Sequence, residues 1–422
     1  MHMMLNPNPK TPICLDVTRL LSRAGLGALT GVDRVERAYV EWALSGERIA
    51  TFLCRTSRGY LLLDPNGARA LLNGLAGTQK WRSADLISKV MGRGNRQRDQ
   101  AEATLRQHII ARALPTGLAR MLRRHLPDET IYLNVGHSNL SQRVLSTWAK
   151  RTGGLSAVLI HDLIPVSYPE FSTPDSTRRF EEILTRLPKN CDLIIANSHD
   201  TADRLANHWR DVSRLPQICV SHLGLTPPPA TEPIEIETKT PFFVAVGTLE
   251  PRKNLTLLLD IWELLAQKVG QNPLPHLHIV GGRGWLSSAL FERIDTHPLN
   301  GIAFFEHGAL SDAQKQYLIE QSQGLLFPSL AEGFGLPPLE ALALGKPVIC
   351  SNLPVLREIL GDKATFLDPS DPDMWVETIR KQLNGMLEVA GLDDFSIPTW
   401  HAHFNQIDVA LENLPPQMSR KA

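Results

Sequence analysis

Short apolar runs alternate with helical stretches along this chain, and the alternation constrains its fold more than any other feature. In the second half of the chain every run ends in a glycine, a charged residue or both. The runs there cover residues 242–246, 276–280, 302–306, 325–327 and 347–350, and those of the first half cover residues 12–17, 48–54, 131–135, 157–160, 193–196 and 218–221. Strands that alternate with helices form parallel sheets with helices on both faces. The sequence therefore predicts an α/β fold.

The chain is also long enough to need two cores. At 422 residues it exceeds the size at which single domains stop growing. Three consecutive prolines at 227–229, followed by an acidic, threonine-bearing run to Thr240, predict a linker over residues 227–240. We therefore expect one domain over residues 1–226 and a second over residues 241–398.

Composition excludes several classes of protein. Lys and Arg together number 44, as do Asp and Glu, so the chain is not a nucleic-acid binder by charge. Its five cysteines are scattered without a CxxC pair, which fits a reducing cytosol and argues against a structural zinc site. No apolar run approaches the roughly 18 residues that span a membrane, and the first ten residues lack an apolar signal region. We expect a cytoplasmic protein.

A helical insertion is expected near residues 64–126. Residues 93–124 hold eight arginines against Asp99 and Glu102. Apolar side chains at Leu105, Ile109, Ile110 and Leu114, and then at Leu118, Met121 and Leu122, suggest two amphipathic helices. Such a pair could make peripheral contact with an anionic membrane through residues 93–124. The alternative, which we favour, is a solvated insertion that packs its apolar stripe on its own domain.

A glycine-rich segment after the first strand has two interpretations. Gly25, Gly27 and Gly31 almost form a dinucleotide fingerprint, but the third gap is one residue too long and no acid closes the second strand. One interpretation is a flexible loop that approaches a phosphate or an acceptor, with Arg34 available as a charge. The other is a plain connecting turn.

The stretch 325–347 predicts a strand, a glycine-bearing turn and a helix that carries two acids. Glu332 lies in the turn and Glu340 in the helix, whose free backbone N–H groups at 333–336 favour a polar or anionic ligand. Arg252 and Lys253 follow another strand at a helix start, where they form either a phosphate clamp or a solvated surface pair.

Glycines at neighbouring strand ends favour the clamp, because they let backbone approach a ligand closely. They are Gly247, Gly281, Gly282, Gly333 and Gly335. Carboxylates accept hydrogen bonds well from sugar and ribose hydroxyls. The clamp, the two acids and the loop together suggest a nucleotide diphosphate sugar.

His161 ends a predicted strand of the first domain, where open α/β sheets carry functional groups. The alternative is a histidine that is hydrogen-bonded to its own loop.

Several segments resemble one enzyme family. Glu332 and Glu340, with seven residues between them in AEGFGLPPLEALALGKPVI, resemble the E-x7-E signature of retaining glycosyltransferases of family 4. The segments VGTLEPRKN, IVGGRGW and HGALSD are similar to other donor-domain segments of that family, in the same order. The first domain is matched through HDLIP and ANSHDTADRL, which look like acceptor-domain strand ends.

The resemblance implies a GT-B fold, with two facing Rossmann-like parallel-sheet domains and an inter-domain cleft. The first domain would bind the acceptor and the second the nucleotide-sugar donor, and residues 399–422 would form a helix that crosses back to the first domain. No cofactor and no metal are implied. The only D-x-D sequence, Asp371 to Asp373, is interpreted as a helix cap and not as a metal site.

The resemblance also implies roles for individual residues. Arg252 and Lys253 would neutralise the leaving diphosphate, and Glu332 would bind hydroxyls of the donor sugar. Glu340 would hold the ribose, and His161 would reach the donor near the reacting centre, with Asp162 beside it. The remaining donor contacts would fall on Gly247, Gly308, Ala309, Leu310, Gly333, Phe334, Gly335 and Leu336.

The predicted function is transfer of a hexose, with retention of anomeric configuration, from a nucleotide diphosphate sugar to a saccharide or lipid-linked saccharide acceptor. GDP-mannose is the first guess for the donor, because the donor half resembles bacterial mannosyltransferases of polysaccharide assembly. Alternatives are a GT-B sugar-nucleotide epimerase, a glycogen- or sucrose-type synthase, and a non-catalytic sugar-nucleotide-binding protein. An epimerase would release free nucleotide without an acceptor. A non-catalytic protein would have a broken site, whereas both cations and both acids are present here.

Overall fold

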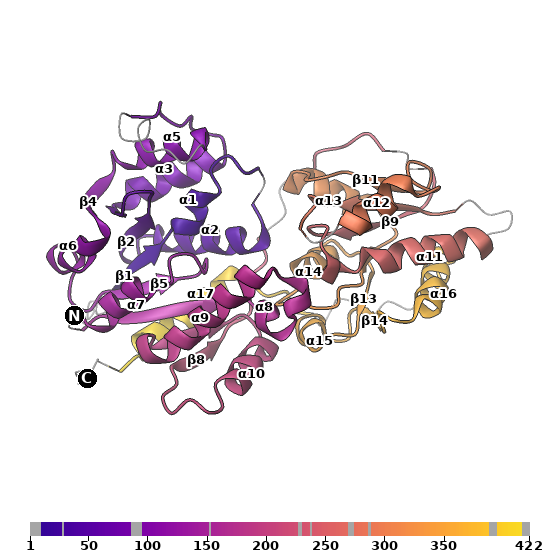
Figure 1. Cartoon of the computed structure of the whole chain (residues 1–422). Coiled ribbons are helices and arrows are strands. Elements are labelled where there is room, and N and C mark those ends of the chain that lie inside the picture. The colour runs from indigo at the N-terminus through magenta and orange to yellow at the C-terminus, as the bar shows by residue number, and fades with distance from the viewer. Residues whose placement is uncertain are drawn as a thin grey trace, which may run out of the picture.

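Two α/β domains stand side by side in the computed structural model (Figure 1). The structure describes residues 10–27, 29–85, 95–151, 153–226, 230–236, 239–268, 274–285, 288–387 and 395–415. Among these residues no helix combines the length and the apolar character needed to cross a bilayer. The five cysteines are all free.

The first domain is built on an eight-stranded sheet of order β4-β3-β2-β1-β5-β6-β7-β8. Its strands are β1 (Lys10–Asp16), β2 (Arg48–Arg55), β3 (Tyr60–Leu63), β4 (Ile109–Ala113), β5 (Ile131–Asn134), β6 (Leu155–Ile160), β7 (Leu193–Ala196) and β8 (Gln217–Val220). The strands from β2 through β1 to β8 pair in parallel, whereas β3 and β4 extend one edge in antiparallel fashion.

Helices cover both faces of this sheet. They are α1 (Thr18–Ser22), α2 (Gly31–Ala43), α3 (Pro65–Leu75), α5 (Arg96–Leu105), α6 (Leu118–His125), α7 (Gln142–Ala149), α8 (Ile164–Ser167), α9 (Pro174–Asn190) and α10 (His199–His208). Short 3-10 turns lie at Pro115–Gly117 and Pro169–Phe171. The Ser198 hydroxyl starts α10 by accepting a hydrogen bond from the Thr201 N–H, as the capping pattern predicts.

The insertion near 64–126 is not helical throughout, so that prediction was wrong in part. Ile109–Ala113 is the edge strand β4, in which Ile110 and Arg112 are exposed and the other three residues are half-buried. In an exposed edge strand, burial alternates from one residue to the next. The spacing of the apolar residues in β4 also fitted a helical stripe, and the segment was therefore assigned to a helix. The second predicted stripe is correct, because α6 buries Leu118, Met121 and Leu122.

The second domain has a six-stranded, all-parallel sheet of order β11-β10-β9-β12-β13-β14. The strands are β9 (Phe242–Val246), β10 (His276–Val280), β11 (Phe304–Glu306), β12 (Leu325–Phe327), β13 (Val348–Ser351) and β14 (Thr365–Leu367). The strand order reverses between β9 and β12. Ligands of doubly wound sheets bind outside the carboxyl ends of strands at such a switch point.

The helices of this domain pack on both faces of its sheet. They are α11 (Leu255–Lys268), α12 (Ser288–Thr296), α13 (Asp312–Gln321), α14 (Leu336–Ala343), α15 (Pro354–Leu360) and α16 (Pro372–Leu383), with a 3-10 turn at Pro251–Lys253. The Asp371 side chain accepts a hydrogen bond from the Met374 N–H at 3.1 Å. The D-x-D sequence therefore caps α16, as predicted.

The last helix, α17 (Trp400–Glu412), lies on the first domain, far from its neighbours in the sequence (Figure 1). The two nitrogens of the buried His403 ring lie 2.8 Å from the Tyr39 hydroxyl and 2.8 Å from the Ser221 hydroxyl. Phe404 stacks on Trp42 with ring centroids 4.9 Å apart. The chain thus returns to the first domain after completing the second.

Candidate active site

The turn between β12 and α14 holds the first acid at the switch point of the second sheet. Gly335 precedes α14 with φ of 99°, a left-handed conformation that glycine adopts without a steric penalty. Prolines in the first turn of α14 cost no hydrogen bond, because N–H groups there have no partner within the helix. This local chemistry fixes the turn that carries Glu332.

Glu332 is buried between two cations. The Lys253 Nζ lies 2.5 Å from its carboxylate and an Arg252 terminal nitrogen lies 2.9 Å from it. Burial raises the pKa of Glu332, but the attraction of Arg252 and Lys253 outweighs burial and lowers that pKa to about 2. Glu332 is therefore ionised at any physiological pH.

The two cations have further partners. Arg252 also bonds the carboxylate of Glu250 at 2.6 Å and the carbonyl of Ala331 at 3.1 Å. Burial lowers the pKa of Arg252, yet Glu332 and Glu250 raise it above its ordinary value. The cluster of Arg252, Lys253, Glu332 and Glu250 is thus balanced in charge, and a diphosphate that enters it must compete with carboxylates for the cations.

Gly247 makes room for one of these cations. It follows β9 with φ of 151°, and a Cβ added there would lie 3.0 Å from the Lys253 Cε. The Lys253 ammonium lies 4.5 Å from the centre of the Phe327 ring. The glycine at this strand end therefore lets Lys253 pass close to the backbone on its way to Glu332.

The second acid, Glu340 of α14, is held from both domains. Arg34 of α2 in the first domain approaches one carboxylate oxygen at 2.5 Å, and Lys315 of α13 approaches the other at 2.9 Å. The sequence marked Arg34 only as an available charge beside the glycine segment. The structure places it against the predicted ribose-binding acid.

His161 lies where the two domains touch. Its Nε2 donates to the carbonyl of Val135 at 2.7 Å, so Nδ1 is the acceptor nitrogen of the neutral ring. Burial lowers the pKa of His161 to about 4. The turns of the two domains are in direct contact, because a Cβ added at Gly333 would lie 2.3 Å from the His161 carbonyl oxygen.

The remaining predicted donor contacts lie on two strand ends of the second sheet. Phe334 and Leu336 flank Gly335 in the turn that carries Glu332. Gly308, Ala309 and Leu310 follow β11, and the Gly308 carbonyl accepts from the Gly281 N–H at 2.8 Å. These residues lie at the carboxyl end of β11, two strands from β9, after which Lys253 follows.

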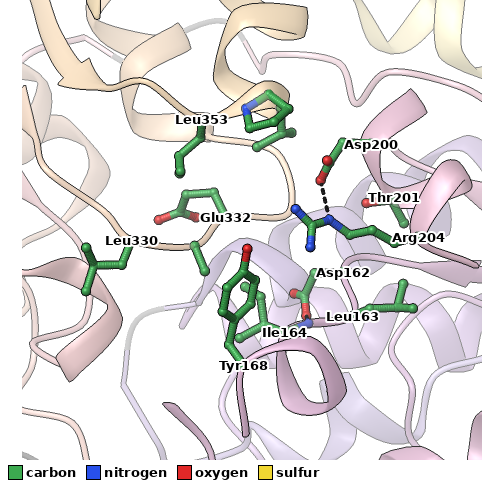
Figure 2. Close-up of a pocket in the computed structure, with 13 residues that line it drawn as sticks. Asp162, Leu163, Ile164, Tyr168, Asp200, Thr201, Arg204, Leu330, Glu332 and Leu353 are labelled. Atoms are coloured by element: carbon green, nitrogen blue, oxygen red, sulfur yellow. Dashed lines mark hydrogen bonds and ion pairs between the residues drawn. The ribbon is translucent and has the colours of Figure 1, made fainter. Parts of the chain in front are cut away.

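An open space of about 380 Å³, part of it continuous with solvent, lies between the domains beside Glu332 (Figure 2). Its first-domain wall comes from the segment after β6 and from α10, and its second-domain wall from the turns after β12 and β13. The lining residues are Asp162, Leu163, Ile164, Tyr168, Asp200, Thr201, Arg204, Leu330, Ala331, Glu332, Leu353, Pro354 and Val355. Of these, only Asp162 and Glu332 were singled out from the sequence. Asp200 and Arg204 lie within the quoted ANSHDTADRL segment, which was the available signal.

A second set of contacts fastens the domains together beside this pocket. Glu358 of α15 accepts from the first two N–H groups of α10, at 2.6 Å from His199 and 3.1 Å from Asp200. Its carboxylate also lies 2.7 Å from the His222 ring. An acid from the second domain thus caps a first-domain helix, in the position that favours negative charge. No sequence pattern indicated this contact.

Comparison with known proteins finds similarity over part of this chain. Residues 230–388 match the family model for glycosyl transferases group 1. The serotype-specific mannosyltransferase WbdA of Escherichia coli is 29% identical over 250 residues, which are 56% of this chain and 30% of WbdA. O-antigen chain mannosyltransferase B of Escherichia coli is 31% identical over 221 residues, 50% of this chain and 57% of that protein. The chain spans less than two thirds of the length of these relatives.

Solved structures identify the fold. Sucrose-phosphate synthase from Thermosynechococcus elongatus has a TM-score of 0.57 at 16% identity, covering 96% of this chain and 95% of that chain. Anabaena HepE in complex with UDP and glucose has a TM-score of 0.56 at 14% identity, covering 95% of each chain. The predicted α/β architecture of two facing domains, the GT-B fold, is therefore confirmed.

Proposed function

We propose that this chain, whose residues 230–388 match glycosyl transferases group 1, is a retaining, metal-independent glycosyltransferase. It moves a hexose from a nucleotide diphosphate sugar to a saccharide or lipid-linked saccharide acceptor in surface polysaccharide synthesis. GDP-mannose is the proposed donor, because the relatives that the chain matches are named as mannosyltransferases.

One observation carries the proposal. Glu332 is held between Arg252 and Lys253 at the carboxyl end of a parallel sheet, directly against the His161 turn of the other domain. A nucleotide sugar combines a polyanion with a polyhydroxylated ring. Cations suit the diphosphate and an ionised carboxylate suits the sugar hydroxyls, so this cluster offers both in adjacent positions.

The chemistry follows from where charge develops. As the bond between the sugar and the diphosphate breaks, negative charge grows on the β-phosphate and positive charge on the sugar ring. Arg252 and Lys253 stabilise the leaving phosphate, and preorganised charge in a buried site is usually the largest catalytic contribution. The acceptor hydroxyl attacks from the face that the phosphate leaves, and the phosphate oxygen takes its proton. The neutral Nδ1 of His161 accepts a hydrogen bond from a donor hydroxyl.

Donor identity is tested by thermal shift against nucleoside diphosphates and nucleotide sugars. A ligand that binds only the native state stabilises it by about 2.7 kcal/mol at a hundred times its Kd. We expect GDP and GDP-mannose to give the largest shifts. A larger shift with another base would overturn the GDP-mannose assignment but leave the reaction class intact.

Reaction class is tested by following the anomeric proton of the product by NMR, with and without EDTA. We expect an α-linked donor to give an α-linked product at the same rate in both conditions.

Lys253→Met should lower the rate on the order of 100-fold, the cost of removing one preorganised charge. The matched control is Lys381→Met, on the exposed face of α16, where the side chain is 52% exposed. An inverted product, or full activity in Lys253→Met, would refute the mechanism.

The apolar stripe of α6 packs on its own domain, as we favoured from the sequence. From the exposed residues beside it we also propose that the far edge of the first domain contacts an anionic membrane surface. Ile110 is 40% exposed and Leu114 is 65% exposed beside Arg112. The exposed arginines of α6 lie at the same edge, which is remote from the second domain (Figure 1). Apolar side chains flanked by arginines suit anionic headgroups. This would hold the otherwise cytoplasmic enzyme at the inner face of the membrane.

Flotation with anionic and neutral liposomes tests the membrane contact. We expect binding to anionic vesicles that weakens with salt and is lost when Arg120, Arg123 and Arg124 are changed to Gln. The same change at Arg178, Arg179 and Arg186 of α9 is the control. Equal flotation of both variants would refute the assignment.

A further inference from the structure

The ion pair between Arg34 and Glu340 joins the two domains near the start of one helix from each. Arg34 lies one turn into α2 and Glu340 one turn into α14. The first residues of these helices also meet, because a Cβ added at Gly31 would lie 3.7 Å from the Leu336 Cδ1 atom. The first domain therefore places a guanidinium directly on the acid that is predicted to bind the ribose.

Glu340 is covered while this ion pair is intact. Its side chain is 11% exposed, with Arg34 at 2.5 Å from one carboxylate oxygen and the Lys315 Nζ at 2.9 Å from the other. The second oxygen is buried and accepts no hydrogen bond of good geometry from the described residues. A buried acceptor without a hydrogen bond costs free energy. A ribose hydroxyl supplies the missing donor only after one of the two cations has moved.

Arg34 is the cation that a ligand displaces more easily. Lys315 belongs to the same domain as Glu340 and also pairs with Asp312 at 3.0 Å. Arg34 reaches across from the other domain, and its side chain is more exposed than that of Lys315, 23% against 15%. Arg34 also lies in the first turn of α2, where the helix dipole disfavours a positive charge. Burial lowers the pKa of Arg34, but Glu340 and Asp312 raise it above its ordinary value, so a second acid stands near the guanidinium.

We propose that Arg34 occupies the ribose-binding acid of the nucleotide-free protein, and that a nucleoside diphosphate must displace Arg34 in order to bind. The inference rests on the proposed glycosyltransferase function and adds a self-inhibitory contact to its donor site. Ribose hydroxyls donate to Glu340 in place of Arg34, so one bond between the domains breaks when nucleotide binds and re-forms when it leaves. Coupling of this kind is reciprocal, so a stronger ion pair means weaker nucleotide binding. If Arg34 instead served as a charge for a phosphate, its removal would have the opposite effect.

Calorimetry with GDP, UDP and ADP separates these two roles. Arg34→Met keeps an unbranched side chain and removes the charge. We expect the nucleotide that binds the wild-type protein best to bind this variant about fivefold more tightly, because it no longer competes with an ion pair. Misfolding does not produce a gain of affinity, so the direction of the change is informative in itself. The control is Arg37→Met, one turn further along α2 and 51% exposed, which should change the affinity by less than about twofold.

A double-mutant cycle then assigns the gain to Glu340. The effect of Arg34→Met is measured in the wild-type background and in a Glu340→Gln background, which lacks both the carboxylate and the ion pair. We expect the gain to fall from about fivefold to less than about twofold in the second background, because Arg34 has no acid left to cover there. Thermal unfolding of each variant without nucleotide shows that the fold is intact.

Three results would contradict the self-inhibitory contact. Weaker binding in Arg34→Met would assign Arg34 to a phosphate, and unchanged binding would show that the ion pair does not oppose the nucleotide. A gain that persists in the Glu340→Gln background would show that it does not arise at Glu340. Failure of the proposed function has a different outcome, in which neither the wild-type protein nor Arg34→Met binds any of the three nucleotides or cleaves a nucleotide sugar, and the inference then fails with it.

Discussion

Replacing Glu332 by glutamine should destabilise the second domain in a pH-dependent manner. Glutamine has the shape of a protonated glutamate, so the change isolates the charge. The pKa of Glu332 falls from an ordinary 4.5 to about 2 on folding, because Arg252 and Lys253 outweigh the effect of burial. At about 1.4 kcal/mol for each pKa unit, the ionised carboxylate contributes roughly 3 kcal/mol at neutral pH.

The sign of the pH dependence follows from linkage. A depressed carboxyl pKa adds stability that is present above pH 4.5 and is lost as the pH falls through about 2. The deficit of Glu332→Gln relative to wild type should therefore shrink from roughly 3 kcal/mol at pH 7 to about 1 kcal/mol at pH 3.

Urea unfolding, followed by tryptophan fluorescence at pH 7, 5, 4 and 3, measures this difference. Glu292→Gln, on the exposed surface of α12, is the control and should change stability by less than about 0.5 kcal/mol. A deficit that stays constant from pH 7 to pH 3, or one below about 1 kcal/mol at pH 7, would refute the view that two cations hold this carboxylate ionised.

Three further perturbations have defined outcomes. Gly333→Ala places a Cβ 2.3 Å from the His161 carbonyl oxygen of the other domain, so the domains must move apart. We expect a larger radius of gyration by X-ray scattering and loss of transfer. The control Gly117→Ala, in which the nearest atom is 3.4 Å away, should change neither. Glu340→Gln should weaken nucleoside diphosphate binding about tenfold, or about 1.4 kcal/mol, in calorimetry; unchanged affinity would contradict the ribose role. Burial lowers the pKa of His161 to about 4. The stability of the wild-type protein should therefore fall more steeply between pH 6.5 and 4 than the stability of His161→Gln, by about 1.36 kcal/mol per pH unit. Thermal unfolding that shifts equally with pH in the two proteins would contradict this.

The sequence predicted five of the six strands of the second domain, all but β14 (Thr365–Leu367), because those strands appear as apolar runs. Buried parallel strands such as Phe242–Val246 and His276–Val280 appear as short continuous apolar runs. The edge strand Ile109–Ala113 has one solvated side, and its mixed pattern was assigned to a helix. The bounds of the long helix α9 were not predicted, although the apolar runs 157–160 and 193–196 frame it, because the segment 174–190 is rich in charged residues and carries a proline at 188.

The candidate site was predictable only where its members are close in sequence. Glu332 and Glu340 share one turn and helix, and Arg252 and Lys253 are adjacent, so motif spacing reached them. The pairing of Arg34 with Glu340 joins residues 306 positions apart, and no local pattern encodes such a contact. The same holds for the contact of Glu358 with the start of α10. Contacts between domains depend on how two finished folds face each other, which periodicity does not describe.

The helix that returns to the first domain has a consequence for the order in which the protein is made. Tyr39, Trp42 and Ser221 leave the ribosome long before His403 and Phe404, which complete their surroundings. Until α17 is synthesised, the first domain must expose an aromatic surface while the whole second domain folds beside it. Domains usually fold as units in the order of synthesis. Here the first domain is synthesised first but is completed last, when α17 is added. Expression of residues 1–226 alone should therefore give an aggregation-prone product, which a separately supplied α17 peptide would rescue.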